Sequence, residues 1–192
     1  AWEIAPVTVA GRKGDLVIDK DEGPFAVNIE KIPTLKPAFR KDGTVTPANS
    51  SSISDGAAAL VLMRASQAAM LGLQPLARIV GHTTNAGVPA LFPSAPVGAM
   101  QKLFAKTGWT ADSVDLYEIN EALVVVTLAA LHDLKLPPGK VNSHGGGHPI
   151  GASGARIVVT LLGALKKHGL KRGVASLCIG GGEATALAVE ML

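Results

Sequence analysis

One glycine-rich stretch of the sequence, residues 141–156, has the composition of a binding or catalytic site. It reads VNSHGGGHPIGASGAR and places His144 and His148 between a predicted strand and a predicted helix. Glycine permits tight turns and close approach to the backbone, and a helix that starts just after such a turn offers unpaired N–H groups to an anion or a developing oxyanion. A metal site would need a third ligand, and the nearby acidic residues have no recognisable ligand spacing, so no metal is expected.

A second stretch places the lone cysteine, Cys178, at the end of an apolar run and just before three glycines, 180–182. A single cysteine in a strand can be a small buried hydrophobic residue with no further role. The glycines favour another interpretation, because bare backbone after a strand leaves N–H groups that can face a ligand. An oxyanion donor or a reactive thiol would be useful there.

A third stretch, YEINEAL, sets Asn120 and Glu121 at a predicted junction between a strand and a helix. Asparagine is a favoured helix cap and glutamate suits the first turn of a helix, so the pair could be purely structural. The histidines outside the glycine-rich stretch, His82, His132 and His168, have no informative neighbours. We expect them to be ordinary surface or packing residues.

Composition limits the class of protein that carries these stretches. With 192 residues, 47% of them hydrophobic and 17% charged, the chain is long enough to bury a core. Its net charge of +3 comes from scattered Lys and Arg, which does not favour nucleic acid as a partner. No run reaches the roughly 18 to 20 apolar residues of a membrane span. One cysteine excludes an internal disulfide and fits a reducing compartment, namely the cytoplasm, the mitochondrial matrix or the peroxisome.

Helical and strand patterns alternate over most of the chain. Residues 1–48 contain charges, turn formers and prolines and are predicted to be irregular. The rest of the pattern predicts a buried helix over 57–72, further helices over 96–108, 121–134 and 154–169, and strands over 76–84, 114–120, 172–180 and 184–192. This alternation indicates an α/β layered domain.

The order of the motifs resembles one known family. The chain carries N-E-A at 120–122, H-P-I-G-A-S-G-A-R at 148–156 and C-I-G-G-G at 178–182. It thereby resembles the C-terminal half of the thiolases, the acyl-CoA acetyltransferases and 3-ketoacyl-CoA thiolases, and GRKGD, LKPAFRKDGTVT and SDGAAALVLM resemble further thiolase segments. The resemblance implies two similar βαβαβ-type halves in a layered α-β-α-β-α body, with a loop domain inserted in the first half. Residues 1–50 would be the tail of that loop domain and residues 51–192 the thiolase C-terminal domain, with the N-terminal half absent.

The resemblance also implies catalytic roles. His148 would activate a nucleophilic cysteine and help to hold the thioester oxygen, and Cys178 would move a proton on and off the acetyl methyl group or the leaving group. Asn120 would position an oxyanion-hole water, and the backbone N–H of Gly180 would donate to the other oxyanion. The implied reaction is thiolytic cleavage of 3-ketoacyl-CoA, or the reverse Claisen condensation of two acetyl-CoA. Coenzyme A thioesters would be the substrates, with no separate cofactor.

Three further positions correspond to substrate contacts in the family. Ser51 aligns with the serine that hydrogen-bonds the pantetheine arm of coenzyme A, although a serine there could also be a turn residue. Phe92 aligns with a pocket-lining position. Leu123 stands where thiolases usually have a phenylalanine beside the pantetheine.

Two departures from the family bear on activity. The thiolase nucleophile lies in the N-terminal half, so we expect this chain alone to be inactive, to work with an N-terminal half that is either a separate polypeptide or not part of this sequence, and to form a dimer or tetramer. Thiolases also read G-G-A-x-x-x-G-H-P where this chain runs from Gly146 to Gly147, about four residues fewer. Four strand residues span about 13 Å, so a true deletion would displace His148. Because the flanking residues keep the family pattern, the simpler hypothesis is an unobserved segment between the two glycines.

Two other functions remain open. One is a non-catalytic thiolase-like subunit that has kept the fold for binding or assembly. The other is a β-ketoacyl synthase, which the sequence favours less because that relative has a histidine where Asn120 stands. A partner polypeptide with a thiolase nucleophile motif would distinguish the catalytic half from the non-catalytic subunit.

Overall fold

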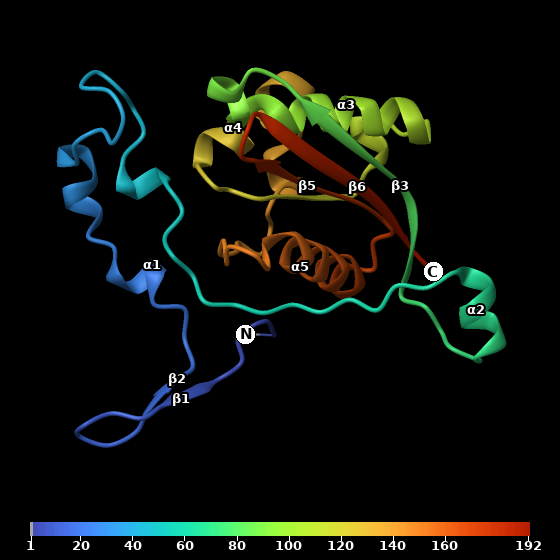
Figure 1. Ribbon diagram of the computed structural model, residues 1–192, viewed down its shortest axis with the longest axis horizontal. Helices are drawn as coiled ribbons and strands as arrows, with labels where there is room; N and C mark the ends of the chain where they lie inside the picture. Colours follow the sequence, from blue (N-terminus) through green and yellow to red (C-terminus); the bar gives the residue numbers. More distant parts are fainter. Residues whose placement is uncertain (1) are drawn as a thin grey trace.

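The computed structural model describes residues 2–192 and centres on a four-stranded mixed sheet with helices on both faces (Figure 1). The strand order is β3-β6-β5-β4, in which β4 and β5 are parallel and the other neighbours are antiparallel. The strands are β3 (Ala77–Ala86), β4 (Leu116–Ile119), β5 (Arg172–Ile179) and β6 (Glu183–Met191). These confirm the four predicted strands and the α/β layered class.

Three helices cover this sheet. Figure 1 shows α3 (Ala95–Thr107) and α4 (Val124–Leu134) on one face and α5 (Ser153–His168) on the other. Gly108 follows α3 with φ 70°, and Gly169 follows α5 with φ 64°, a left-handed conformation that glycine adopts at little cost and that ends a helix. The predicted helices over 96–108, 121–134 and 154–169 are therefore confirmed.

The strands carry side chains to both faces, and this alternation divides the core into two clusters. Tyr117 and Ile119 of β4 pack with α3 and α4, as does Val174 of β5. Leu116 and Ala175, one position away on the same strands, pack with α5 instead. The ends of β4 and β5 can thus direct functional side chains to either side of the sheet.

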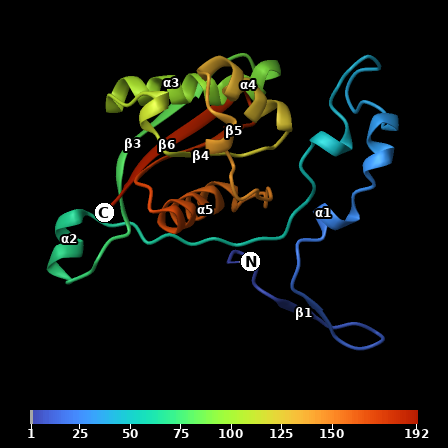
Figure 2. The same cartoon turned by 180° about the vertical axis from the view of Figure 1, so that it is seen from behind.

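The predicted buried helix over 57–72 is wrong for most of its length. Only α2 (Ala65–Met70) is helical, whereas residues 51–64 are extended and, within the described chain, belong to no helix or strand. This extended segment passes along the α5 side of the domain (Figures 1 and 2). Val61 and Leu62 are 88% and 70% exposed. An apolar run indicates burial, but burial needs other parts of the protein to cover it, and these side chains stay exposed.

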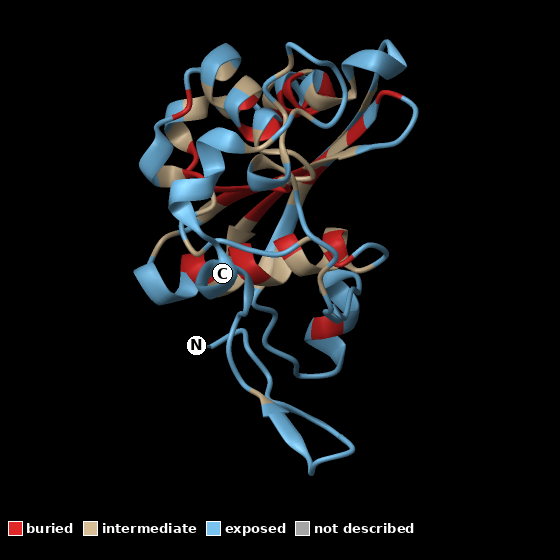
Figure 3. Ribbon diagram, turned by 90° about the vertical axis from the view of Figure 1, so that its left-hand side faces the viewer, coloured by how far each residue is buried: buried red, intermediate tan, exposed pale blue. Residues whose placement is uncertain are grey.

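The first quarter of the chain extends away from the sheet and is mostly exposed (Figure 3). Its elements are short: β1 (Val7–Val9), β2 (Leu16–Ile18), α1 (Gly23–Ala26) and the 3-10 turns η1 (Ile29–Thr34) and η2 (Pro47–Asn49). Strands β1 and β2 form a separate antiparallel ribbon. This agrees with the prediction of an irregular segment over 1–48. In the described part of the chain, every helix falls short of the length and apolar character needed to cross a membrane.

The glycine-rich loop before α5 is continuous. Gly146 and Gly147 are consecutive residues of the full sequence, and the structure describes both. The hypothesis of a further segment between them stays a prediction. A β-carbon on Gly146, whose φ is 156°, would clash with the end of the Arg156 side chain, so a larger residue there would have to displace the guanidinium.

Candidate active site

Asn120 leaves the end of β4 in a fixed, buried position. It is 1% exposed, and its backbone N–H donates to the carbonyl of Ser176 on β5 at 3.0 Å. Its side-chain Nδ2 lies 3.1 Å from Nδ1 of His148. The structural alternative, a helix cap, is not realised, because the N-cap residue of α4 is Leu123 and it makes no side-chain capping bond. The amide of Asn120 faces the histidine instead of the helix.

His148 is held through one ring nitrogen. Nδ1 also lies 2.7 Å from Oγ of Ser153, the buried first residue of α5, and that hydroxyl is 2.9 Å from the carbonyl of Pro149. An asparagine amide nitrogen can only donate, so Nδ1 accepts and the proton of the neutral ring sits on Nε2. Among residues 2–192 both hydrogen-bond contacts of the ring involve Nδ1, which leaves the Nε2–H for a substrate oxygen.

Cys178 lies near the end of β5, opposite Ala184 of β6, and is half-buried against the core under α3 and α4. Burial raises the pKa of its thiol, more than a backbone hydrogen bond lowers it, so the thiol stays protonated at neutral pH. Within residues 2–192 no hydrogen bond joins Cys178 to Asn120 or His148. The resemblance gives catalytic roles to Asn120, His148 and Cys178, which requires all three side chains to meet in one pocket. The structure establishes contact for Asn120 and His148, and the place of Cys178 beside them stays a prediction.

The three glycines after Cys178 form the turn between β5 and β6. Gly181 and Gly182 adopt φ values of 88° and 86°. A β-carbon on Gly182 would come within 2.6 Å of the Gly87 carbonyl, so this position is closely packed, whereas nothing lies within 4 Å of a β-carbon on Gly180. The backbone of Gly180 is exposed and open to a ligand, as its predicted role requires.

The predicted substrate residues lie beside the same strand end. Ser51 donates from its hydroxyl, at 2.8 Å, and from its backbone N–H, at 3.1 Å, to the carbonyl of Ala122. Its neighbour Ser50 forms an isolated β-bridge with Leu123. Ser51 thus lies beside Ala122 and Leu123, which follow Asn120 by two and three residues. Phe92 is half-buried in η3 (Pro89–Ser94), a turn that packs against α4, β5 and β6.

A buried ion pair beneath the site was not singled out from the sequence. Glu118 of β4 lies 3.5 Å from Arg156 of α5. Burial raises the pKa of Glu118 to about 8; Arg156 opposes this rise, and the carboxylates of Glu3 and Glu121 add to it. The sequence did contain a signal for this pair, namely a glutamate inside the apolar run LYEI, because buried charges are rare unless they are paired.

The other histidine of the glycine-rich stretch has different partners. His144 stacks on His168 at 5.3 Å between ring centroids, with their Nε2 atoms 3.1 Å apart, and Trp2 packs edge-on against it at 5.7 Å. His132 pairs with Asp133 at the surface. In the described chain, no group of three or more His, Cys, Asp and Glu side chains could hold a metal ion.

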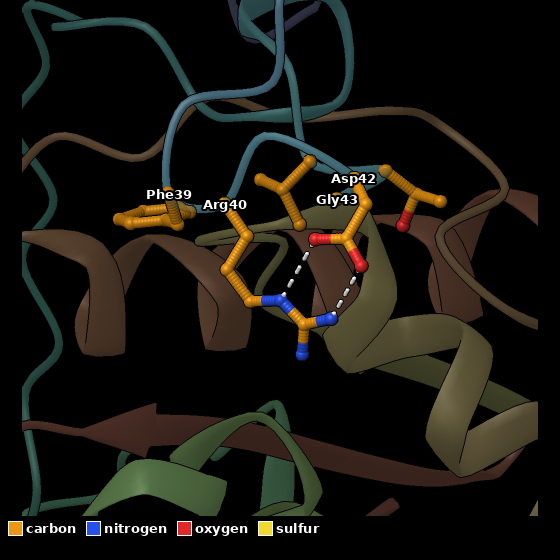
Figure 4. Close-up of a pocket in the computed structure, with 6 residues that line it drawn as sticks. Phe39, Arg40, Asp42 and Gly43 are labelled. Atoms are coloured by element: carbon orange, nitrogen blue, oxygen red, sulfur yellow. Dashed lines mark hydrogen bonds and ion pairs between the residues drawn. The ribbon is translucent and has the colours of Figure 1, made fainter.

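A shallow hollow lies in the N-terminal segment, apart from the predicted site residues (Figure 4). Phe39, Gly43, Thr44 and Val45 line it together with Arg40 and Asp42, which form an ion pair at 2.9 Å. Both charged side chains are 76% exposed, so water surrounds the pair. Such an exposed ion pair contributes little binding specificity.

The mixed sheet and its helices define a layered α/β domain. It carries a candidate acid–base site, which consists of the Asn120–His148 pair at the end of β4 and the cysteine on the adjacent strand β5. Comparison with known families agrees with the motif order. The model "Thiolase, C-terminal domain" matches residues 73–191, and "Thiolase, N-terminal domain" matches residues 1–66. The chain belongs to the thiolase family.

Individual relatives support this membership. Acetyl-CoA acetyltransferase 1 of Arabidopsis thaliana is 50% identical over all of this chain, which covers 48% of that protein. The mouse protein named "Acetyl-CoA acetyltransferase, cytosolic" is 48% identical over 98% of the chain, which covers 49% of it. The chain therefore spans about half the length of the curated relatives it matches.

Solved structures share the fold. The Bacillus anthracis acetyl-CoA acetyltransferase has a TM-score of 0.89 and 47% identity, and human mitochondrial 3-ketoacyl-CoA thiolase has a TM-score of 0.84 and 33% identity. Each match covers 98% of this chain and 49% of the other. The N-terminal family match continues to residue 66, past the predicted domain boundary at residue 50, and so includes the extended segment 51–64. That boundary stays a prediction.

Proposed function

We propose that this chain supplies the C-terminal catalytic residues of a thiolase, which cleaves 3-ketoacyl-CoA with coenzyme A or condenses two acetyl-CoA in the reverse direction. The hydrogen bond between Asn120 and His148 carries the proposal, because it unites two motif residues 28 positions apart at one end of the sheet. The names of the similar proteins, acetyl-CoA acetyltransferases and a 3-ketoacyl-CoA thiolase, support the same chemistry.

In the cleavage direction, a cysteine of the N-terminal half attacks the 3-keto carbon and the bond between carbons 2 and 3 breaks. The Nε2–H of His148 stabilises the thiolate of that cysteine and, once the sulfur has attacked, donates to the thioester oxygen on which negative charge develops. One Nδ2 proton of Asn120 meets His148 and the other is available to position an oxyanion-hole water, while the Gly180 N–H stabilises the second oxyanion.

The protonated thiol of Cys178 is suited to protonate the enolate that leaves when the bond between carbons 2 and 3 breaks. It gives its proton to the carbon of the departing acetyl-CoA enolate, and the resulting thiolate recovers a proton from the coenzyme A thiol that accepts the acyl group. A raised pKa favours this acid role over that of the nucleophile, which must be a thiolate. A reducing compartment keeps this thiol available.

The proposed activity also needs the rest of the N-terminal half, on the same polypeptide or on another one. The extended segment 51–64 offers it an apolar surface, with Ile53 98% and Val61 88% exposed. Exposed apolar surface of this kind marks interaction sites. Ser51 and Leu123, which meet beside the strand end, would contact the pantetheine arm of acyl-CoA, and Phe92 would line the pocket. The completed enzyme is proposed to form a dimer or tetramer.

Reconstitution tests the proposal. The chain is co-produced with the part of Arabidopsis acetyl-CoA acetyltransferase 1 that precedes the matched region, and cleavage of acetoacetyl-CoA is followed in the presence of coenzyme A. We expect no turnover by either piece alone and turnover by the pair. Cys178→Ala and His148→Ala should abolish it, whereas His132→Ala, at a surface position, should not. A pair that assembles and binds acyl-CoA without turnover would favour the non-catalytic subunit.

A further inference from the structure

The side chain of Asn142 makes three hydrogen bonds, and all three involve the residues on either side of Asn120. Its Oδ1 accepts the backbone N–H of Ile119 at 2.8 Å, and its Nδ2 donates to the carbonyl of Ile119 at 2.9 Å. Nδ2 also donates to the Glu121 carboxylate at 2.6 Å. An amide group has two N–H donors, and here both are used on the segment that carries Asn120.

The Asn142 side chain continues the hydrogen bonding along the edge strand β4 at the point where the Asn142 backbone turns away from that strand. One residue earlier the pairing is ordinary: Val141 forms a parallel bridge with Tyr117, and the Asn142 N–H donates to the Tyr117 carbonyl at 2.9 Å. At Asn142 the chain then adopts φ 49° and enters the glycine loop. The carboxamide offers Ile119 the same acceptor and donor that a strand peptide would offer, so β4 stays paired to its last residue.

This arrangement matters because the Asn120 amide has few contacts of its own. Its Oδ1 is buried and, among residues 2–192, has no hydrogen-bond partner, so His148 is the contact that orients the amide directly. The backbone of Asn120 is held by Ser176 on one edge of β4, and the residues on either side of it are held by Asn142 on the other. Any rotation of the strand end would move Nδ2 away from the histidine.

We propose that Asn142 is a positioning residue that keeps Asn120 in hydrogen-bond contact with His148. Its importance for turnover rests on the proposed thiolase function, but the positioning itself is a property of this chain. Loss of Asn142 should break the Asn120–His148 bond even where the sheet and helices remain folded. A residue that only stabilised the sheet would lower the melting temperature and leave that bond intact.

The test observes the bond directly in the full 192-residue chain. A scalar coupling through the N–H···N hydrogen bond, from Asn120 Nδ2 to His148 Nδ1, is measured by NMR on labelled protein. We expect the coupling in the wild type and in the neighbouring surface variant Ser143→Ala, and its loss in Asn142→Ala. Exchange of the Asn120 side-chain amide protons should become at least about tenfold faster, equivalent to about 1.4 kcal/mol. An unchanged coupling in Asn142→Ala overturns the proposal.

A second variant keeps the test decisive if Asn142→Ala does not fold. Asn142→Asp tolerates the left-handed backbone and keeps an acceptor for Ile119, but it loses both donated bonds and sets a carboxylate against Glu121. The coupling should weaken in it and recover partly in Asn142→Asp combined with Glu121→Gln, because a glutamine amide can donate back. Failure of the double variant to recover it contradicts the proposal. Inactivity of the reconstituted pair with the coupling present would count against the thiolase function alone.

Discussion

The Glu118 carboxylate lies 3.5 Å from the Arg156 guanidinium, and the two side chains are only 3% and 17% exposed. Glu118 precedes Asn120 by two residues on β4, and Arg156 follows Ser153 by three on α5. The ion pair therefore ties the strand that ends just before Asn120 to the helix whose first residue, Ser153, contacts His148. Because burial raises the pKa of Glu118 to about 8, both partners are charged only above that pH, and below it a protonated carboxyl stays beside the guanidinium.

Stability should fall as the pH rises because of Glu118. An unfolded glutamate ionises near pH 4.5, whereas burial raises the pKa of Glu118 in the folded chain to about 8. Between these values the folded chain binds more protons, so the free energy of unfolding decreases with pH and levels off above about 8. The loss is at most about 5 kcal/mol, at about 1.4 kcal/mol per pKa unit. Urea unfolding from pH 5 to 8 should show this slope in the wild type and a flatter one in Glu118→Gln; parallel profiles would contradict it.

The tautomer of His148 should depend on its two neighbours at Nδ1. Asn120 Nδ2 and Ser153 Oγ both approach that nitrogen, so a neutral ring carries its proton on Nε2. Nitrogen-15 NMR above the titration range should find a single Nε2–H form. Ser153→Ala keeps the Asn120 donor and should keep this form, whereas Asn120→Ala leaves Nδ1 beside the Ser153 hydroxyl, which donates to the Pro149 carbonyl, and should give a mixture of tautomers. A protonated Nδ1 in the wild type would mean that the Asn120 amide is turned the other way.

Much of the sheet could be predicted from the sequence because its local signals agree. Gly108 and Gly169 end helices at the expected positions, and the apolar run before Asn120 forms a strand. The segment 57–64 was predicted wrongly because its apolar composition indicates a buried helix, whereas burial depends on neighbours far away in the chain and these side chains stay exposed.

The contacts of the site were harder to predict than its residues. Asn120 and His148 were identified by type and motif, but their hydrogen bond depends on Ser176, Ser153 and Asn142, which a sequence pattern does not connect. Each of these three is an ordinary polar residue locally. Its role arises only when β4, β5 and the loop before α5 meet.

Cys178 should react slowly with alkylating agents at neutral pH. Burial raises the pKa of its thiol, so less of the reactive thiolate is present than in a small free thiol. Because Cys178 is the only cysteine, mass spectrometry of the intact chain reports its alkylation by iodoacetamide without ambiguity. We expect a rate at pH 7.5 below that of glutathione and a rise as the pH is increased. Fast reaction with a midpoint below pH 8 would refute the acid role proposed for the thiol.

Alanine substitution of two glycines, one in α5 and one in the strand beneath it, should change the stability of the chain in opposite directions. A β-carbon on Gly173, in β5 under α5, would come within 2.9 Å of the buried Leu161 side chain, so Gly173→Ala overpacks the core and should cost about 1–3 kcal/mol. Gly154, in the first turn of α5, has nothing within 4 Å of such a β-carbon, and Gly154→Ala should stabilise by up to about 1 kcal/mol. Thermal unfolding measures both, at about 2–4 °C per kcal/mol for a chain of this size.

Gly173→Ala combined with Leu161→Val should recover part of the lost stability, because the shorter side chain yields the space that the methyl group needs. An equal loss in the single and double variants would show that Leu161 is not what the added methyl group meets.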